Sequence, residues 1–237
     1  DIYLTGNPQI TFFKVVYRRH TNFSMESIEQ TFNGSADFGT KVSCTISRNG
    51  DLISNVYLEV QLKPTTDKYC WTNWIGHALI QSVEVEIGGQ RIDKHYGDWM
   101  HIWNELTQKT GHAAGYASMV GNTATMTKTG TAITANKLYI PLRFWFCNNP
   151  GLALPLIALQ YHEVKINIEF NTFQSCIRSD VAVSDESMTS ASLYVDYIYL
   201  DTDERRRFAQ VSHEYLIEQL QFTGEESVSG NSTGIYG

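Results

Sequence analysis

The chain has 237 residues, of which 42% are hydrophobic, 12% aromatic and 18% charged, and its formal net charge is -7. This composition excludes an intrinsically disordered chain, because it supplies enough apolar side chains for a core. It also argues against a basic shell wrapped around nucleic acid, since phosphate neutralisation needs clustered Lys and Arg. We therefore expect a folded protein with no direct nucleic-acid partner.

Eight segments show the composition and alternation of β-strands: 8–17, 24–32, 40–48, 54–63, 81–87, 137–146, 161–171 and 191–200. Turn residues separate several of them, including Asn49-Gly50-Asp51 and the Gly88-Gly89 hairpin between Ile87 and Gln90. Eight antiparallel strands in one domain favour a jelly roll, the common eight-stranded sandwich built from two Greek keys. The predicted fold class is therefore all-β, an eight-stranded antiparallel jelly-roll sandwich with short helical insertions.

Two helical insertions are expected between the strands. Four apolar residues recur at i, i+3, i+4 and i+7 on one helical face: Trp99, Ile102, Trp103 and Leu106. Asp98 is placed to cap the start of this helix, and Gly111 follows its end. Residues 73–80 predict a shorter helix, and the Gly-, Ala- and Thr-rich residues 111–136 predict a long exposed excursion.

The connection between the strands at 137–146 and 161–171 is too apolar for a freely solvated loop. Five branched apolar residues lie in it: Leu152, Leu154, Leu156, Ile157 and Leu159. We expect this connection to pack against something, and a second subunit is the natural partner. These five residues are therefore the candidate subunit interface.

The composition changes after Leu200. A charged stretch at 201–207 leads into 214–222, where Leu216, Leu220 and Phe222 alternate with polar residues as in the opening strand of another domain. The sequence predicts a first domain at 1–200, an inter-domain linker at 201–212 and the start of an incomplete second domain at 213–237. We expect a truncated chain or a part of a longer one. The basic run at 205–207 follows acidic residues, which favours local charge pairing over a phosphate site.

The residue types that carry metal or redox chemistry are scattered. Cys44, Cys70, Cys147 and Cys176 are far apart and form no C-x-x-C pair, so they are expected to be core thiols rather than zinc or redox ligands. His95 and His101 lack the i, i+3 or i, i+4 spacing with which one helical face holds a metal. No metal site and no cofactor are predicted.

No catalytic constellation is evident either. Glu84 and Glu86 share one strand face, as paired carboxylates of a glycosidase would, but Glu-x-Glu alternation is equally what an accessible strand face produces. No G-x-S-x-G, P-loop or G-x-G-x-x-G motif is present, so no enzyme is predicted. The aromatic residues leave one alternative open, a carbohydrate-binding sandwich that acts in attachment. A cupin-like metalloenzyme is a third hypothesis, for which the sequence shows no set of metal ligands.

Two features bear on the compartment. No segment has the length of a transmembrane helix, and the first residues lack the pattern of a signal peptide, so the cytosol is the default expectation. Asn22, Asn33 and Asn231 fit the glycosylation sequon, but such triplets often arise by chance and require a secretory route. Their glycosylation stays open.

Three ordered segments resemble the major capsid protein of nucleocytoplasmic large DNA viruses. They are YLTGNPQITFFKVVYRRHTNF at 3–23, IGGQRIDKHYGDW at 87–99 and RFWFCNNPGLALPLIALQYHEVKI at 143–166. In that family each protomer carries two consecutive jelly rolls, and three protomers form a pseudo-hexagonal capsomer that tiles an icosahedral shell. The resemblance thus implies that residues 213–237 begin a second jelly roll and that the protein is structural.

The same resemblance implies the partners and the location. The expected partners are two further copies in a homotrimer, neighbouring capsomers, and minor capsid and penton proteins, with the inner viral membrane nearby. The expected location is the virion capsid after synthesis in the host cytoplasm, within the viral factory.

The order of the strands also predicts how the connections are placed. Loops of a jelly roll alternate between its two ends, so the residues 88–136 and 172–190 should share one end. The connections 64–80 and 147–160 should then lie at the opposite end. The family resemblance places the long excursions on the outer surface of the shell.

Overall fold

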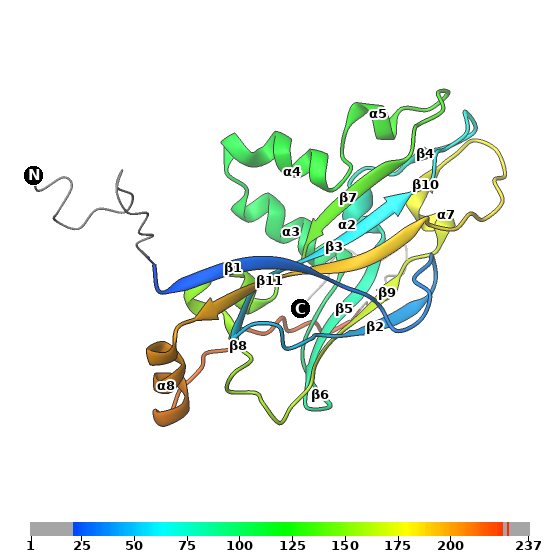
Figure 1. Cartoon of the computed structure of the whole chain (residues 1–237). Coiled ribbons are helices and arrows are strands. Elements are labelled where there is room, and N and C mark those ends of the chain that lie inside the picture. The colour runs from blue at the N-terminus through cyan, green and yellow to red at the C-terminus, as the bar shows by residue number, and fades with distance from the viewer. Residues whose placement is uncertain (1–20, 225–226, 228–237) are drawn as a thin grey trace, which may run out of the picture.

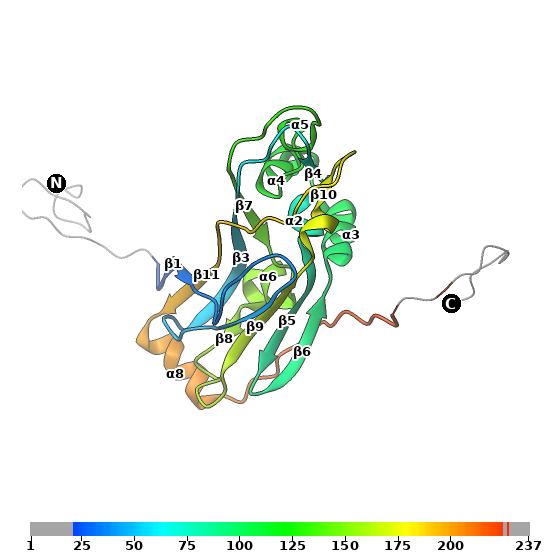
Figure 2. The same ribbon diagram turned by 90° about the vertical axis from the view of Figure 1, so that its right-hand side faces the viewer.

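Two antiparallel sheets face one another in the computed structural model, which describes residues 21–224 and 227 (Figures 1 and 2). The first sheet has the order β1 (Phe23–Gln30), β11 (Ser190–Leu200), β3 (Leu52–Leu62) and β7 (Asn136–Pro141), and the short β8 (Leu154–Pro155) also pairs with β3. The second has the order β2 (Lys41–Thr45), β9 (Val164–Phe170), β5 (Ile80–Ile87) and β6 (Gln90–His95). A third pairing joins β4 (Cys70–Trp71) to β10 (Ile177–Arg178).

The strand orders β1-β11-β3-β7 and β2-β9-β5-β6 are those of the two sheets of a jelly roll, so the predicted fold class is confirmed. The core lies between the sheets, where every second residue of the central strands β3, β5 and β9 is apolar. Val56, Leu58, Val60 and Leu62 of β3 are almost completely buried, as are Val83 and Val85 of β5 and Ile166 and Ile168 of β9. Three of the four cysteines, Cys44, Cys70 and Cys176, are buried free thiols, which confirms their expected place in the core.

The predicted strands differ from the observed ones in several places, and the prediction at 8–17 lies outside the described residues. The strand expected at 214–222 is not formed, and strand β6 at 90–95 and the two-residue strands β4, β8 and β10 were not predicted. The core-facing positions of β6 carry Asp93 and His95 instead of apolar residues, so hydrophobic periodicity gave no signal there. Strand β7 also ends earlier than predicted, at Pro141, and the chain turns into helix α6 (Trp145–Asn148).

The helices are α2 (Ile75–Ala78), α3 (Gly97–Thr107), α4 (Ala113–Met119), α5 (Ala124–Thr127), α6, α7 (Phe173–Cys176) and α8 (Thr202–Gln210), with 3-10 turns at Thr110–His112 and Pro150–Leu152. Both predicted helices are present. Helix α3 starts one residue before Asp98, which lies in its first turn and does not cap it. Helix α8 was not predicted; Asp201 caps it by accepting a hydrogen bond from the backbone N–H of Glu204 at 3.2 Å.

The placement of one connection was predicted wrongly. The segment before β5 lies at the same end as the long excursion, because the backbone N–H of Thr65 donates to Ile133 O at 2.9 Å and β4 pairs with β10. The error follows from the unpredicted strand β6. Because each strand carries the chain from one end of the sandwich to the other, one extra strand moves the connections that follow it to the opposite end. The 147–160 connection does lie at the opposite end, where the Ile157 N–H donates to Asp51 O at 3.2 Å, and Figure 2 shows the two ends clearly.

Candidate subunit interface

The 147–160 connection is anchored to the first sheet. Its short strand β8 pairs with the start of β3, where Leu154 lies opposite Ile53. Leu154 and Leu156 are 2% and 3% exposed and belong to the core of this chain. They are therefore not available to a partner, and their apolar character is explained by packing within the monomer.

The other three predicted interface residues have a different environment. Leu152, Ile157 and Leu159 are each partly exposed, and Leu159 also packs against the core. The guanidinium of Arg48 donates to the carbonyl oxygens of His162, at 2.7 Å, and of Leu159, which fixes the end of the connection. A stable backbone thus presents three half-covered aliphatic side chains at this end of the sandwich.

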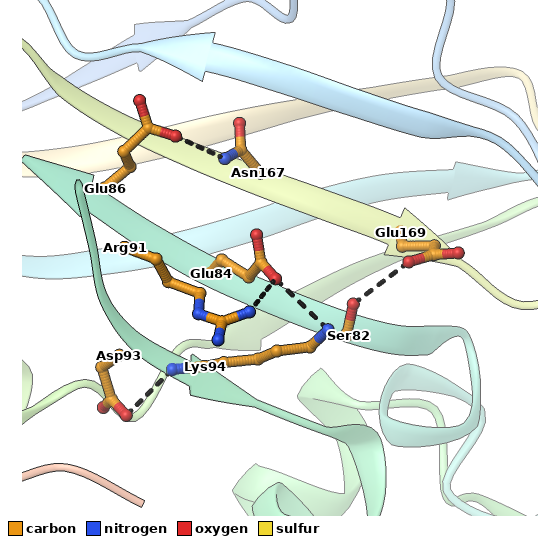
Figure 3. Close-up of polar contacts among 8 residues, drawn as sticks. All are labelled: Ser82, Glu84, Glu86, Arg91, Asp93, Lys94, Asn167 and Glu169. Carbon is orange, nitrogen blue, oxygen red and sulfur yellow. Dashed lines mark hydrogen bonds and ion pairs between the residues drawn. The ribbon is translucent and has the colours of Figure 1, made fainter. Parts of the chain in front are cut away.

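The outer face of the second sheet is polar (Figure 3). Glu84 forms an ion pair with Lys94 at 3.2 Å and a longer one with Arg91 at 3.5 Å. The side-chain amide of Asn167 donates a hydrogen bond to the carboxylate of Glu86 at 3.4 Å. The alternate residues Val83 and Val85 are buried, so the Glu-x-Glu pattern is that of an accessible strand face. Surface ion pairs of this kind contribute little stability but keep the face soluble and charge-balanced.

The predicted helix stripe is not buried as its periodicity suggests. Helix α3 turns Gly97, Met100 and Asn104 towards the protein, whereas Ile102 and Leu106 are 49% and 76% exposed. Hydrophobic periodicity could not identify the buried positions of α3, because two of the three, Gly97 and Asn104, are not apolar. Gly97 sits against the carbonyl oxygens of His77 and Ile80, where no larger residue fits.

His95, His77 and His101 each lie beside another polar or aromatic side chain. His95 Nε2 lies 2.8 Å from the carboxylate of Asp93, and His101 lies beside His77, whose Nε2 is 2.7 Å from the hydroxyl of Tyr116. Within residues 21–224 and 227, no three His, Cys, Asp or Glu side chains are grouped to hold a metal ion. In the same part of the chain, no helix has the length and apolar character needed to cross a bilayer.

The basic run follows the expected local pairing. Arg206 pairs with Asp203 and Arg207 with Glu204, at 3.6 and 3.4 Å. The third arginine, Arg205, reaches further and pairs with Asp51 at 2.8 Å.

A family model described as the major capsid protein N-terminus matches residues 11–201. The chain belongs to the viral major capsid protein family. The resemblance seen in the sequence is thereby confirmed, and membership of a capsid family favours a structural role over a carbohydrate-binding one.

Relatives within the major capsid protein family are close. The major capsid protein of Pyramimonas orientalis virus is 69% identical over 231 residues, which cover 97% of this chain and 57% of that protein. The major capsid protein of Paramecium bursaria Chlorella virus 1 is 50% identical over 239 residues, which cover 98% of this chain and 53% of that protein. The chain spans about half the length of the curated relatives that it matches.

Solved structures agree with the fold. A quasi-atomic model of the PBCV-1 virus capsid matches with a TM-score of 0.76 at 47% identity, over 94% of this chain and 53% of that one. The Faustovirus major capsid protein matches with a TM-score of 0.64 at 11% identity, over 84% of this chain and 58% of that one, which shows a shared fold alone.

Proposed function

We propose that this chain forms the first jelly roll of a structural, non-enzymatic capsid subunit of a large DNA virus. The observation that carries the proposal is the 69% identity to a major capsid protein across nearly the whole chain, on a fold with jelly-roll strand order. The subunit would act in the virion capsid after synthesis in the host cytoplasm. Its domain division would be 1–200 for the first jelly roll, 201–212 for the linker and 213–237 for the start of the second.

Assembly is the core of this function. Three subunits would form a homotrimeric, pseudo-hexagonal capsomer that contacts neighbouring capsomers, minor capsid and penton proteins, and lies near the inner viral membrane. The rigid sandwich suits such a role, because lateral contacts between shell subunits need surfaces that keep their shape.

The interface proposal concerns the end of the sandwich that carries the 147–160 connection. Leu152, Ile157 and Leu159 remain its candidate contacts, because they are half-covered aliphatic residues on an anchored backbone. Partly exposed apolar residues of this kind are typical of the centre of an obligate interface before the partner covers them. Leu154 and Leu156 would support the interface from within the core.

The proposal can be tested with a full-length chimera, in which the part of this chain that matches the Pyramimonas orientalis virus protein precedes the polypeptide that follows the matched region in that protein. Light scattering should give three times the protomer mass. Ile157→Asp combined with Leu159→Asp should reduce the trimer fraction at a given concentration, whereas Val181→Asp, at an exposed apolar residue elsewhere, should not. A chimera that stays monomeric at every concentration would refute trimeric assembly.

A further inference from the structure

Helix α4 and the 3-10 turn before it are attached to the sandwich through one buried side chain. Of residues 110–119, which make up this turn and helix, only Tyr116 is buried. A Cβ at Gly111 or Gly115 would meet no other atom within 4 Å, so this stretch is loosely packed elsewhere. We call residues 110–119 the α4 flap.

The α4 flap lies between two fixed points of the backbone. Before it, the N–H of Gln108 donates to Asn104 O of helix α3 at 2.9 Å. After it, Val120 is completely buried, and its carbonyl oxygen accepts a hydrogen bond from the N–H of Gly76 at 2.9 Å. A local opening of the flap therefore has to free Tyr116 and can leave both fixed points in place.

Tyr116 is held by a histidine. Its hydroxyl lies 2.7 Å from Nε2 of His77, a residue of α2 that is 3% exposed. The ring of His77 stacks on that of Trp74, with centroids 5.6 Å apart, and no described residue forms a hydrogen bond with its buried Nδ1. The guanidinium of Arg143 lies over the ring of Tyr116 at 5.7 Å. The contact that closes the flap thus contains a titratable ring that is shielded from water.

The charged groups around His77 are mostly basic. From α3, the ring of His101 lies 5.5 Å from that of His77, and Arg143 approaches from the segment after β7. Asp98 and Glu105 are the acidic residues of α3, and Asp98 borders the same hollow as His77. Both are exposed, and among the described residues neither forms an ion pair with a histidine. The α4 flap itself contains no carboxylate.

Arg143 also has acidic neighbours, which do not pair with it. Asp93 and Glu218 line a hollow together with Arg143. Within residues 21–224 and 227, neither carboxylate lies within ion-pair distance of the guanidinium, and Asp93 instead lies 2.8 Å from Nε2 of His95. The positive charge of Arg143 therefore still disfavours a proton on His77.

These surroundings make the closing contact sensitive to acid. Burial, and then His101 and Arg143, lower the pKa of His77 to about 4 from an ordinary value near 6.5. In the open flap water reaches the ring and restores its ordinary pKa. The neutral ring thus stabilises the closed flap fully above about pH 6.5, and this contribution is lost as the pH falls towards 4.

We propose that acid opens the α4 flap: protonation of His77 releases Tyr116, so that residues 110–119 detach while the two sheets stay folded. Both ring nitrogens of a protonated histidine carry hydrogen, and Nδ1 of His77 has no acceptor in the closed flap. Opening brings water to His77 and Arg143 together, so the subunit presents a cationic surface in acid that is covered at neutral pH. The inference goes beyond the capsid role and does not depend on it.

Hydrogen exchange of the 237-residue chain tests the opening. Amide protection is measured by mass spectrometry at pH 7 and pH 5 and corrected for the intrinsic effect of pH on exchange. With a pKa of about 4 in the closed flap and about 6.5 in the open one, the amides of α4 should lose about 20-fold in protection at pH 5. They should also be less protected than those of β9 at both pH values, because the flap opens without unfolding the sandwich. Equal protection of α4 and β9 would overturn the proposal.

Two histidine variants identify the titrating group. In His77→Gln the protection of α4 should change by less than about threefold between pH 7 and pH 5, since residue 77 no longer titrates. The control His112→Gln removes an exposed histidine of the flap itself and should keep the 20-fold change. A 20-fold change that survives in His77→Gln, or that disappears in His112→Gln, would contradict the role of His77.

Tyr116→Phe tests the anchor. The variant loses the hydroxyl that meets His77 but keeps the ring, so the protection of α4 should fall several-fold at pH 7. Its further loss at pH 5 should remain, because closing the flap still shields His77 from water. Unchanged protection at pH 7 would refute Tyr116 as the anchor. Should His77→Gln fail to fold, equal protection of α4 at the two pH values in the wild type would still overturn the proposal.

Discussion

Asp51 and Arg205 form the link that fastens helix α8 to the end of the sandwich. Arg205 donates from Nε at 2.9 Å and from Nη2 at 2.8 Å to one oxygen of Asp51, whose other oxygen accepts the Leu200 N–H at 2.8 Å. Asp51 is only 5% exposed, so these partners take the place of water around its carboxylate.

Asp51→Ala should therefore lower the free energy of unfolding by about 2 kcal/mol, because a buried hydrogen-bond network loses its centre. Arg205→Ala should cost less, about 1 kcal/mol, since the arginine is half exposed and solvent screens the pair. The control Arg206→Ala removes only a surface pair with Asp203 and should change stability by less than about 0.5 kcal/mol. Urea unfolding measures all three, and equal losses would contradict a special role for Asp51.

Gly97 determines how closely α3 approaches α2. A Cβ at this position would lie 2.2 Å from His77 O and 2.6 Å from Ile80 O, both backbone atoms that cannot move aside easily. Gly97→Ala should destabilise the chain by about 3 kcal/mol or prevent folding. Gly111→Ala, where a Cβ meets nothing within 4 Å, should be tolerated. Thermal melting compares the two, and a native melting temperature for Gly97→Ala would contradict the packing described.

His77 makes stability depend on pH. Burial, helped by the nearby His101 and Arg143, lowers the pKa of His77 to about 4 from an ordinary value near 6.5. The folded state therefore favours the neutral ring. The contribution of neutral His77 to the free energy of unfolding is complete above about pH 6.5 and is lost as the pH falls towards 4. Between pH 7 and pH 5 the loss should be about 2 kcal/mol.

The variant His77→Gln isolates that contribution. It retains a polar group that can meet the Tyr116 hydroxyl but does not titrate, so its unfolding free energy should change less between pH 7 and pH 5 than that of the wild type. Urea titrations at the two pH values measure the difference. Parallel losses in both proteins would show that another group is responsible.

The two kinds of leucine in the 147–160 connection should respond differently to charge. Leu156→Asp puts a carboxylate into the core, so the chain should not fold stably, and Leu154→Asp should behave alike. Ile157→Asp should leave the monomer folded because its side chain is partly exposed. Circular dichroism and a urea titration of each variant test this, and a folded Leu156→Asp monomer would contradict the observed burial.

Sequence patterns predicted most of the sandwich because its core strands alternate strictly between apolar and polar residues, as β3 and β9 do. Sequence patterns failed where the residues that face the core are polar. Strand β6 places Asp93 and His95 inwards, with His95 Nε2 2.8 Å from the carboxylate of Asp93, and no single-residue scale anticipates such a pair.

The site was harder to predict for a related reason. Apolar residues mark burial without saying what buries them, so Leu154 and Leu156 could not be distinguished from Ile157 and Leu159. The stripe on α3 raised the opposite difficulty, since its regular spacing predicts packing while Ile102 and Leu106 are exposed. Three-dimensional placement was needed to separate core from contact surface.

Electron microscopy of the full-length chimera tests the central claim most directly. If the chain is the first jelly roll of a capsid subunit, single particles should be compact trimers with a pseudo-hexagonal outline, formed by six sandwiches of similar size. Particles that contain one subunit, or trimers without six-fold pseudo-symmetry, would contradict the account.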